Sequence, residues 1–115
     1  LALYTSDATL NASTTAYSTP DEIPASGQYS AGGGNLINAG TSVATSTAIV
    51  DFQDLSFTGV TINTRGALIY NSSSSVTSNA AVAVLDFGSD KSVTAGTFTI
   101  QFPAFTTSAA IIRIT

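Results

Sequence analysis

Alternation of apolar and polar residues is the feature of this sequence that most restricts its fold. Residues 97–102 (TFTIQF) alternate strictly, as a half-buried β-strand does. No segment has apolar residues at i, i+3, i+4 and i+7 over three turns, which is the spacing of an amphipathic helix. Thr, Val, Ile, Phe and Tyr suit a pleated sheet, and Glu22 is the only Glu in the chain. The chain is therefore predicted to be all-β.

Strand-like segments separated by turn signals follow one another along the chain. We expect about eight short strands, which favours a single-domain antiparallel β-sandwich, jelly-roll-like in architecture. Both faces of residues 81–87 are largely apolar, so this strand is predicted to be central in its sheet. Gly59 predicts a bulge or bend, and Pro103 predicts the end of a strand. The expected strands lie near residues 1–5, 35–38, 47–52, 55–62, 67–70, 81–87, 97–102 and 111–114, with polar loops at 71–79 and 88–96.

The length of 115 residues predicts one domain over residues 1–115, because chains divide into several domains only well beyond about 200 residues. The longest irregular stretch is predicted at residues 19–34, which contain Pro20, Pro24 and a Gly triplet. Loops of this length in compact domains are usually functional or bound to a partner. This Pro/Gly-rich loop and an N-terminal arm over residues 1–17 are our candidates for reaching a neighbouring molecule.

The residue types that are missing exclude most chemistry. The chain has no His and no Cys, so it lacks the commonest general base, a thiolate nucleophile and the usual ligands of zinc and iron. Three Lys and Arg residues are too few to neutralise a nucleic-acid backbone. The longest apolar run, residues 80–85, is far shorter than the roughly twenty residues of a membrane span. We therefore predict no enzymatic activity, no cofactor or metal, and no nucleic-acid or membrane partner.

Two groups of acidic residues have alternative interpretations. Asp51 and Asp54 lie three positions apart and could act as an acid/base pair or as cation ligands, although turn or edge positions are the simpler interpretation. Asp86 and Asp90 could hold calcium, but two carboxylates are few for that ion. Residues 86–88 spell the Asp-Phe-Gly of kinases by chance, because the other kinase motifs are missing.

Cations and tyrosines are the candidate interface residues. The two arginines each adjoin apolar residues, so each needs a carboxylate or carbonyl partner or a contact with another protein. A structural ion pair and an interface contact are both consistent with the sequence. Tyrosine combines an apolar ring with a polar tip and is frequent at interfaces. The candidates are Arg65, Arg113, Tyr4, Tyr17 and Tyr29.

The small number of charges favours an assembly-forming role. Only 9% of residues are charged, compared with about 25% in typical domains, whereas the chain contains 16 Ser and 18 Thr. Natural monomers use charge to protect sheet edges and to stay apart. The mean hydropathy of +0.31 argues against disorder. A folded but nearly uncharged surface is compatible with burial against other copies or partners.

Several segments resemble a family of small virion structural proteins of tailed bacteriophages. The resemblance implies a capsid decoration, or cement, protein on the outer capsid surface. It further implies a β-rich homotrimer that binds the major capsid (coat) protein at junctions between capsomers. The loop of four Ser after Asn71 departs from the family by its length. The similar segments are residues 61–71 (TINTRGALIYN), 81–91 (AVAVLDFGSDK), 96–103 (GTFTIQFP) and 110–114 (AIIRI), with residues 1–17 and VDFQDLSFT at 50–58.

Two other functions are compatible with the same sequence. A tail, collar or head-fibre component would keep the virion but change the place of the protein in it. A host- or carbohydrate-binding β-sandwich module would need exposed aromatic rings that stack on sugars. The chain has no Trp, so its four Tyr residues are the candidates for such stacking.

Overall fold

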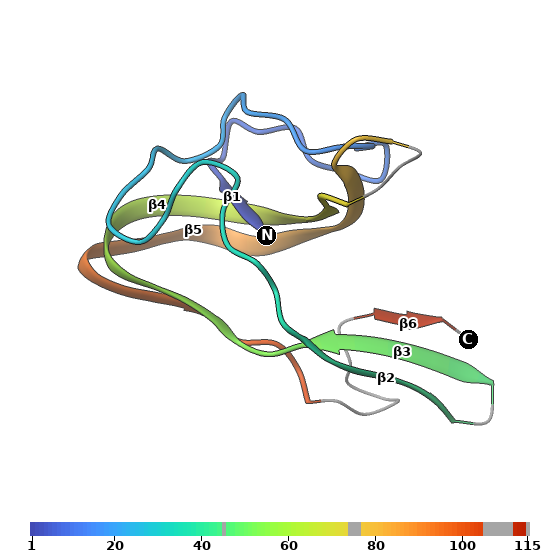
Figure 1. The fold of residues 1–115 in the computed structure, drawn as a ribbon. Helices are drawn as coiled ribbons and strands as arrows, with labels where there is room; N and C mark the ends of the chain where they lie inside the picture. The colour runs from blue at the N-terminus through green and yellow to red at the C-terminus, as the bar shows by residue number, and fades with distance from the viewer. Residues whose placement is uncertain (45, 74–76, 105–111, 115) are drawn as a thin grey trace. The chain divides into compact units, whose positions relative to one another are not determined.

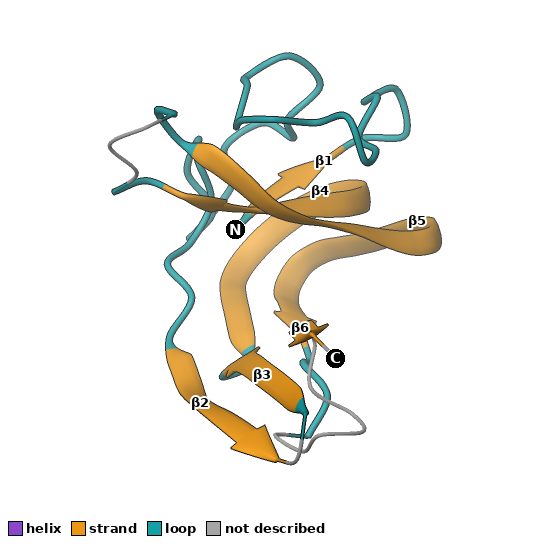
Figure 2. Cartoon of the chain, turned by 90° about the vertical axis from the view of Figure 1, so that its right-hand side faces the viewer, coloured by secondary structure: helices purple, strands orange, loops and turns teal. Residues whose placement is uncertain are grey.

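Six β-strands and no helix occur in the computed structural model, which describes residues 1–44, 46–73, 77–104 and 112–114. They form two antiparallel three-stranded sheets with strand orders β1-β4-β5 and β2-β3-β6 (Figures 1 and 2). The all-β prediction is thus confirmed. The strands are β1 (Ala2–Tyr4), β2 (Asn38–Ala44), β3 (Thr47–Phe52), β4 (Leu55–Asn71), β5 (Ala80–Ile100) and β6 (Ile112–Ile114).

The chain divides into two compact units. Unit 1 comprises Leu1–Gly34 and Phe57–Phe98, and unit 2 comprises Asn35–Ser56 and Thr99–Thr115. The long strands β4 and β5 each run from one unit into the other. The single domain over residues 1–115 stays a prediction, as does the packing of the sheets as a sandwich.

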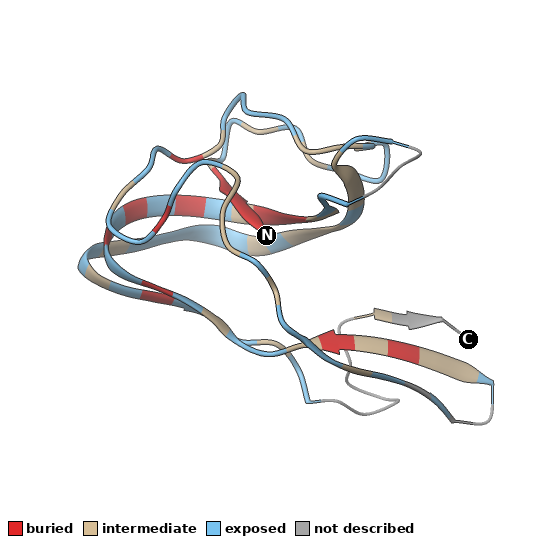
Figure 3. Ribbon diagram, in the orientation of Figure 1, coloured by how far each residue is buried: buried red, intermediate tan, exposed pale blue. Residues whose placement is uncertain are grey.

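The core of unit 1 lies where β1 pairs with β4. The antiparallel register places Ala2 opposite Leu68 and Tyr4 opposite Gly66. All three residues of β1 are buried, and so are residues 67–69 of β4, which shows that both faces of this pairing are covered. Figure 3 shows buried residues along β1 and β4 and mostly intermediate or exposed residues along β5.

Residues 5–34, which we call the irregular segment, contain no strand and bind the sheet of unit 1 through their backbone. Ile23 donates its N–H to the Leu3 carbonyl at 3.0 Å, and Gln28 donates to the Thr58 carbonyl at 3.1 Å. The first four residues are buried and three of them form β1, so the N-terminal arm expected over residues 1–17 does not include them.

β3 is the middle strand of the unit 2 sheet. It was predicted at residues 47–52, and the structure confirms both ends. β2 pairs antiparallel with one side of β3, and β6 pairs with the other side in a register that places Ile49 opposite Arg113. β6 confirms the strand expected at the end of the chain, of which Ile111 lies outside the described residues.

Two predictions about β5 are wrong. The loop expected at residues 88–96 is part of the strand. Left-handed backbone at Gly88 (φ 79°) and Ala95 (φ 46°) lets the strand bend without ending. Residues 81–87 were predicted to be central, but β5 is the outer strand of its sheet and β4 is the central one. The position of a strand depends on its neighbours, and an apolar pattern on both faces cannot identify them.

The ends of β4 and β5 and the loop between them can be compared with the predicted boundaries. The segments expected at 55–62 and 67–70 form one strand, β4, which continues through Gly59 in a left-handed conformation. Fewer and longer strands than expected are the result. β5 ends before Pro103, as predicted, because proline has no N–H to donate to a ladder. The loop expected at 71–79 separates β4 from β5, with residues 74–76 outside the described part of the chain.

Candidate interaction surface

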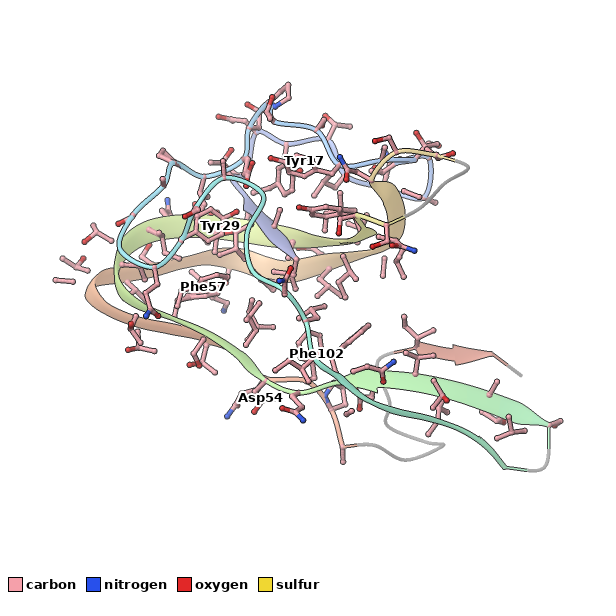
Figure 4. All side chains as sticks on the ribbon, viewed as in Figure 1. Tyr17, Tyr29, Asp54, Phe57 and Phe102 are labelled. Atoms are coloured by element: carbon pink, nitrogen blue, oxygen red, sulfur yellow. The ribbon has the colours of Figure 1, made fainter. Side chains whose placement is uncertain are left out.

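The Glu22 carboxylate, in the irregular segment, accepts three hydrogen bonds. The Tyr17 hydroxyl donates to Oε2 at 2.6 Å, and the Tyr29 hydroxyl and the Gly32 N–H donate to Oε1 at 2.8 and 2.7 Å. The Tyr29 hydroxyl also accepts the Leu3 N–H at 2.9 Å. We call Tyr17, Glu22, Tyr29 and Gly32 the Glu22 cluster; Figure 4 shows the two rings between the irregular segment and the unit 1 sheet. The cluster therefore links the irregular segment to β1.

The other two tyrosines bind the same segment through backbone carbonyls. The Tyr4 hydroxyl donates to the Ser18 carbonyl at 2.7 Å, and the Tyr70 hydroxyl donates to the Gly32 carbonyl at 2.7 Å. The Tyr70 ring also stacks on Tyr17 with 4.8 Å between ring centroids. All four tyrosines thus fasten the irregular segment to the sheet.

The three tyrosines predicted to be interface residues differ in how far their side chains are buried. Tyr4 and Tyr29 are each 1% exposed, so they are core residues that a partner molecule cannot reach in this fold. Tyr17 is partly buried and its hydroxyl is already bonded to Glu22. Sequence reasoning missed Glu22 itself, for which the one available signal is that it is the only Glu in the chain.

Burial raises the pKa of all four tyrosines above the ordinary value of 10.0. Loss of hydration is the largest cause for each, because a phenolate loses more by leaving water than a phenol does. The negative charge of Glu22 raises each pKa further. For Tyr17 and Tyr29 the hydrogen bond donated to Glu22 adds to the shift, because only the protonated phenol can donate it.

The free energy of unfolding is expected to fall as the pH rises above 10. The folded chain holds its tyrosine protons to higher pH than the unfolded chain, so the protonated tyrosines stabilise the folded state. This contribution to the free energy of unfolding is complete below pH 10, the pKa in the unfolded chain, and is lost as the pH rises towards the raised pKa values of the folded chain. Denaturant unfolding at about pH 8 and about pH 11, with tyrosinate absorbance recorded in parallel, measures the effect. Equal stability at both pH values, with all four phenols titrating normally, would contradict it.

The two arginines lie in different units. The Arg65 guanidinium is 3.9 Å from the Asp90 carboxylate, and both side chains are nearly half exposed. Such a pair contributes less than about 1 kcal/mol, so Arg65 is available to a partner. Arg113 occupies the β6 position opposite Ile49, and its side chain lies outside the described part of the structure.

The acidic pairs have separate structural roles. Asp51 is 1% exposed and its Oδ1 accepts the Phe52 N–H at 2.9 Å, whereas Asp54 accepts the Phe102 N–H at 2.8 Å (Figure 4). Asp86 accepts the Gly88 N–H at 2.8 Å. Among the described residues, no group of three or more acidic, His or Cys side chains is placed to hold a metal ion.

Two grooves lie between the irregular segment and the sheet of unit 1, and both reach β5. The first has a volume of about 270 Å³ and is lined by Ala8, Leu10 and Arg65 among others. The second has about 420 Å³ and is lined by residues 11, 12 and 14 and by β5 residues 81–84. Val84 lines both grooves, so they adjoin along the first part of β5.

Exposed large apolar side chains mark the outer strands of both sheets. Val82 on β5 is 51% exposed, Val43 on β2 is 70% exposed, and Ile37, just before β2, is 61% exposed. Neither strand has a partner on its outer side over most of its length within the described residues. The β5 edge with the two grooves is the candidate interaction surface of unit 1, and the β2 edge is a separate candidate in unit 2.

Comparisons with protein-family models, with curated proteins and with solved structures give no match. The part of the chain that the structure describes contains no helix that is long and apolar enough to cross a membrane.

Proposed function

We propose that this chain is a bacteriophage virion structural protein that decorates the outer capsid surface and binds the major capsid protein. The observation that supports a binding role most directly is the open, apolar edge of β5 beside two grooves. The low charge and the similar segments described above support the virion assignment. The proposal includes a β-sandwich of jelly-roll-like architecture, for which the two antiparallel sheets are the support.

A decoration role requires contact area and no reactive group. The coat shell of a tailed phage holds DNA under outward pressure, so junctions between capsomers are its weak points. A standard protein interface buries about 1,600 Å². A protein that binds the assembled lattice and not the separated subunits stabilises the lattice by mass action. We propose that the bound form is a homotrimer.

The burial of aromatic rings weighs against a carbohydrate-binding module. Tyr4 and Tyr29 are 1% exposed, and the rings of Tyr17 and Tyr70 stack on each other. Sugar binding by stacking needs an exposed ring face. A glycan array would test this alternative directly.

An icosahedral reconstruction of the particle that contains this protein tests the proposal. Density for the all-β chain is expected at junctions between capsomers on the outer surface. Particles lacking the protein are expected to rupture at a lower temperature. Adding the purified chain to intact particles of this kind should restore the normal rupture temperature. Density confined to the tail, collar or head fibre would contradict capsid decoration and favour the second virion location.

A further inference from the structure

The outer edge of β5 begins as a paired strand and then becomes open. Ala16 and Ala80 form an antiparallel bridge, with hydrogen bonds of 2.9 Å from Tyr17 N–H to the Asn79 carbonyl and from Ala81 N–H to the Thr15 carbonyl. Beyond this bridge, no described residue outside β4 forms a backbone hydrogen bond with residues 82–98. A further strand could therefore continue the ladder that residues 15–17 begin.

The first residues of the open part, 82–85, lack the usual protection of a sheet edge. Sheet edges in soluble proteins are commonly protected by charge, proline or a cover. Residues 80–85 are all apolar, the first charged residue of β5 is Asp86, and Val82 is 51% exposed. The grooves of about 270 and 420 Å³ adjoin these residues and include the apolar Ala8 and Leu10. An extended strand would both extend the ladder and cover this apolar surface.

A second open edge occurs on β2. Within the described residues β2 pairs with β3 alone, on one side. Its sequence, NAGTSVA, contains no charged residue and no proline, and Val43 is 70% exposed. An uncharged strand with an exposed branched apolar residue is suited to pairing with another edge.

We propose that β2 of one copy of this chain pairs with β5 of a second copy. The alternative, symmetric pairing of β5 with β5, is less favourable because residues 79–81 are already occupied by the irregular segment. Pairing centred in the remaining residues 82–98 would bring Asp90 close to its own copy, and like charges opposite each other destabilise a sheet. β2 has no charge and avoids this repulsion.

Pairing between two different edges has a defined consequence for assembly. Each copy offers both edges, so the contact is head-to-tail, and it forms a closed ring if the rotation between copies closes. A trimer is one such ring. The inference rests on the homotrimer of the proposed function and deepens it by naming the strands that join the copies, and it can be tested without a coat lattice.

Single cysteines test this contact cleanly, because the chain has no Cys of its own. We expect Val43→Cys and Val82→Cys proteins to form a disulfide-linked dimer when they are mixed and mildly oxidised. Each variant alone should form far less dimer. Efficient dimers of Val82→Cys alone or of Val43→Cys alone would instead show symmetric pairing of β5 or of β2 and overturn the proposal. A mixture that cross-links no better than its components would overturn it too.

Light scattering of charge variants gives a second measurement. Val43→Lys and Val82→Lys each place a charge on an exposed edge position and should leave the far-ultraviolet circular dichroism unchanged. Each is expected to raise the dissociation constant of the oligomer at least about tenfold. Ala25→Lys, on an exposed position of the irregular segment, is the control and should not change it. A wild-type chain that is monomeric at all concentrations would overturn the proposal without bearing on capsid binding.

Discussion

Glu22→Ala is expected to lower the free energy of unfolding by about 3–4 kcal/mol, because each lost hydrogen bond to a charged acceptor costs about 1.5–3 kcal/mol and the losses partly overlap. The substitution removes the acceptor of Tyr17, Tyr29 and Gly32. The Tyr29 hydroxyl, in a side chain that is 1% exposed, would lose the acceptor for its proton. Chemical denaturation followed by circular dichroism measures the change.

Two further variants distinguish the loss of the hydrogen bonds to Glu22 from the loss of one negative charge. Asp7→Ala removes the same charge from an exposed position of the irregular segment and should cost less than about 0.5 kcal/mol. Glu22→Gln keeps one acceptor oxygen and should fall between the two. If Glu22→Ala and Asp7→Ala had equal effects, the carboxylate would not be fastening the irregular segment to the sheet.

The Glu22 cluster shows why part of this structure could not be predicted from the sequence. Tyr17 and Tyr29 are five and seven residues from Glu22, but neither spacing has a meaning outside a regular helix or strand. Their meeting depends on the path of the irregular segment over β1. The chain has no helical or strand period there to reveal that path.

For the strands, the sequence predicts local extent better than position in the sheet. Residues 47–52 could be predicted to both ends because branched residues and alternation act locally. The central or outer position of β5 could not be predicted, because it depends on which strands pair with it. The largely apolar pattern on both faces of its first residues is typical of an interior strand. Pairing with a second copy, as proposed, would make β5 an interior strand of the joined sheet.

Gly27→Ala is expected to cost about 3–5 kcal/mol, in the range reached by steric strain at a buried backbone contact. Gly27 has φ +52°, and a Cβ built on it would lie 2.1 Å from the Gly59 carbonyl oxygen and 2.8 Å from that of Thr58. Both atoms belong to the backbone of β4 and cannot rotate away. The turn would have to move off β4, which would break the hydrogen bond of Gln28 N–H to the Thr58 carbonyl and that of Thr61 N–H to Ser26 Oγ.

Gly88→Ala is the matched control for this effect. Gly88 also has a left-handed conformation, with φ +79°, but a Cβ there would meet no atom within 4 Å. It should therefore cost about 1–2 kcal/mol, the conformational penalty alone. Hydrogen exchange at the Gln28 and Thr61 amides should quicken in Gly27→Ala and stay unchanged in Gly88→Ala. Equal losses of stability in the two variants would mean that backbone conformation, and not the close approach to β4, accounts for the glycine at position 27.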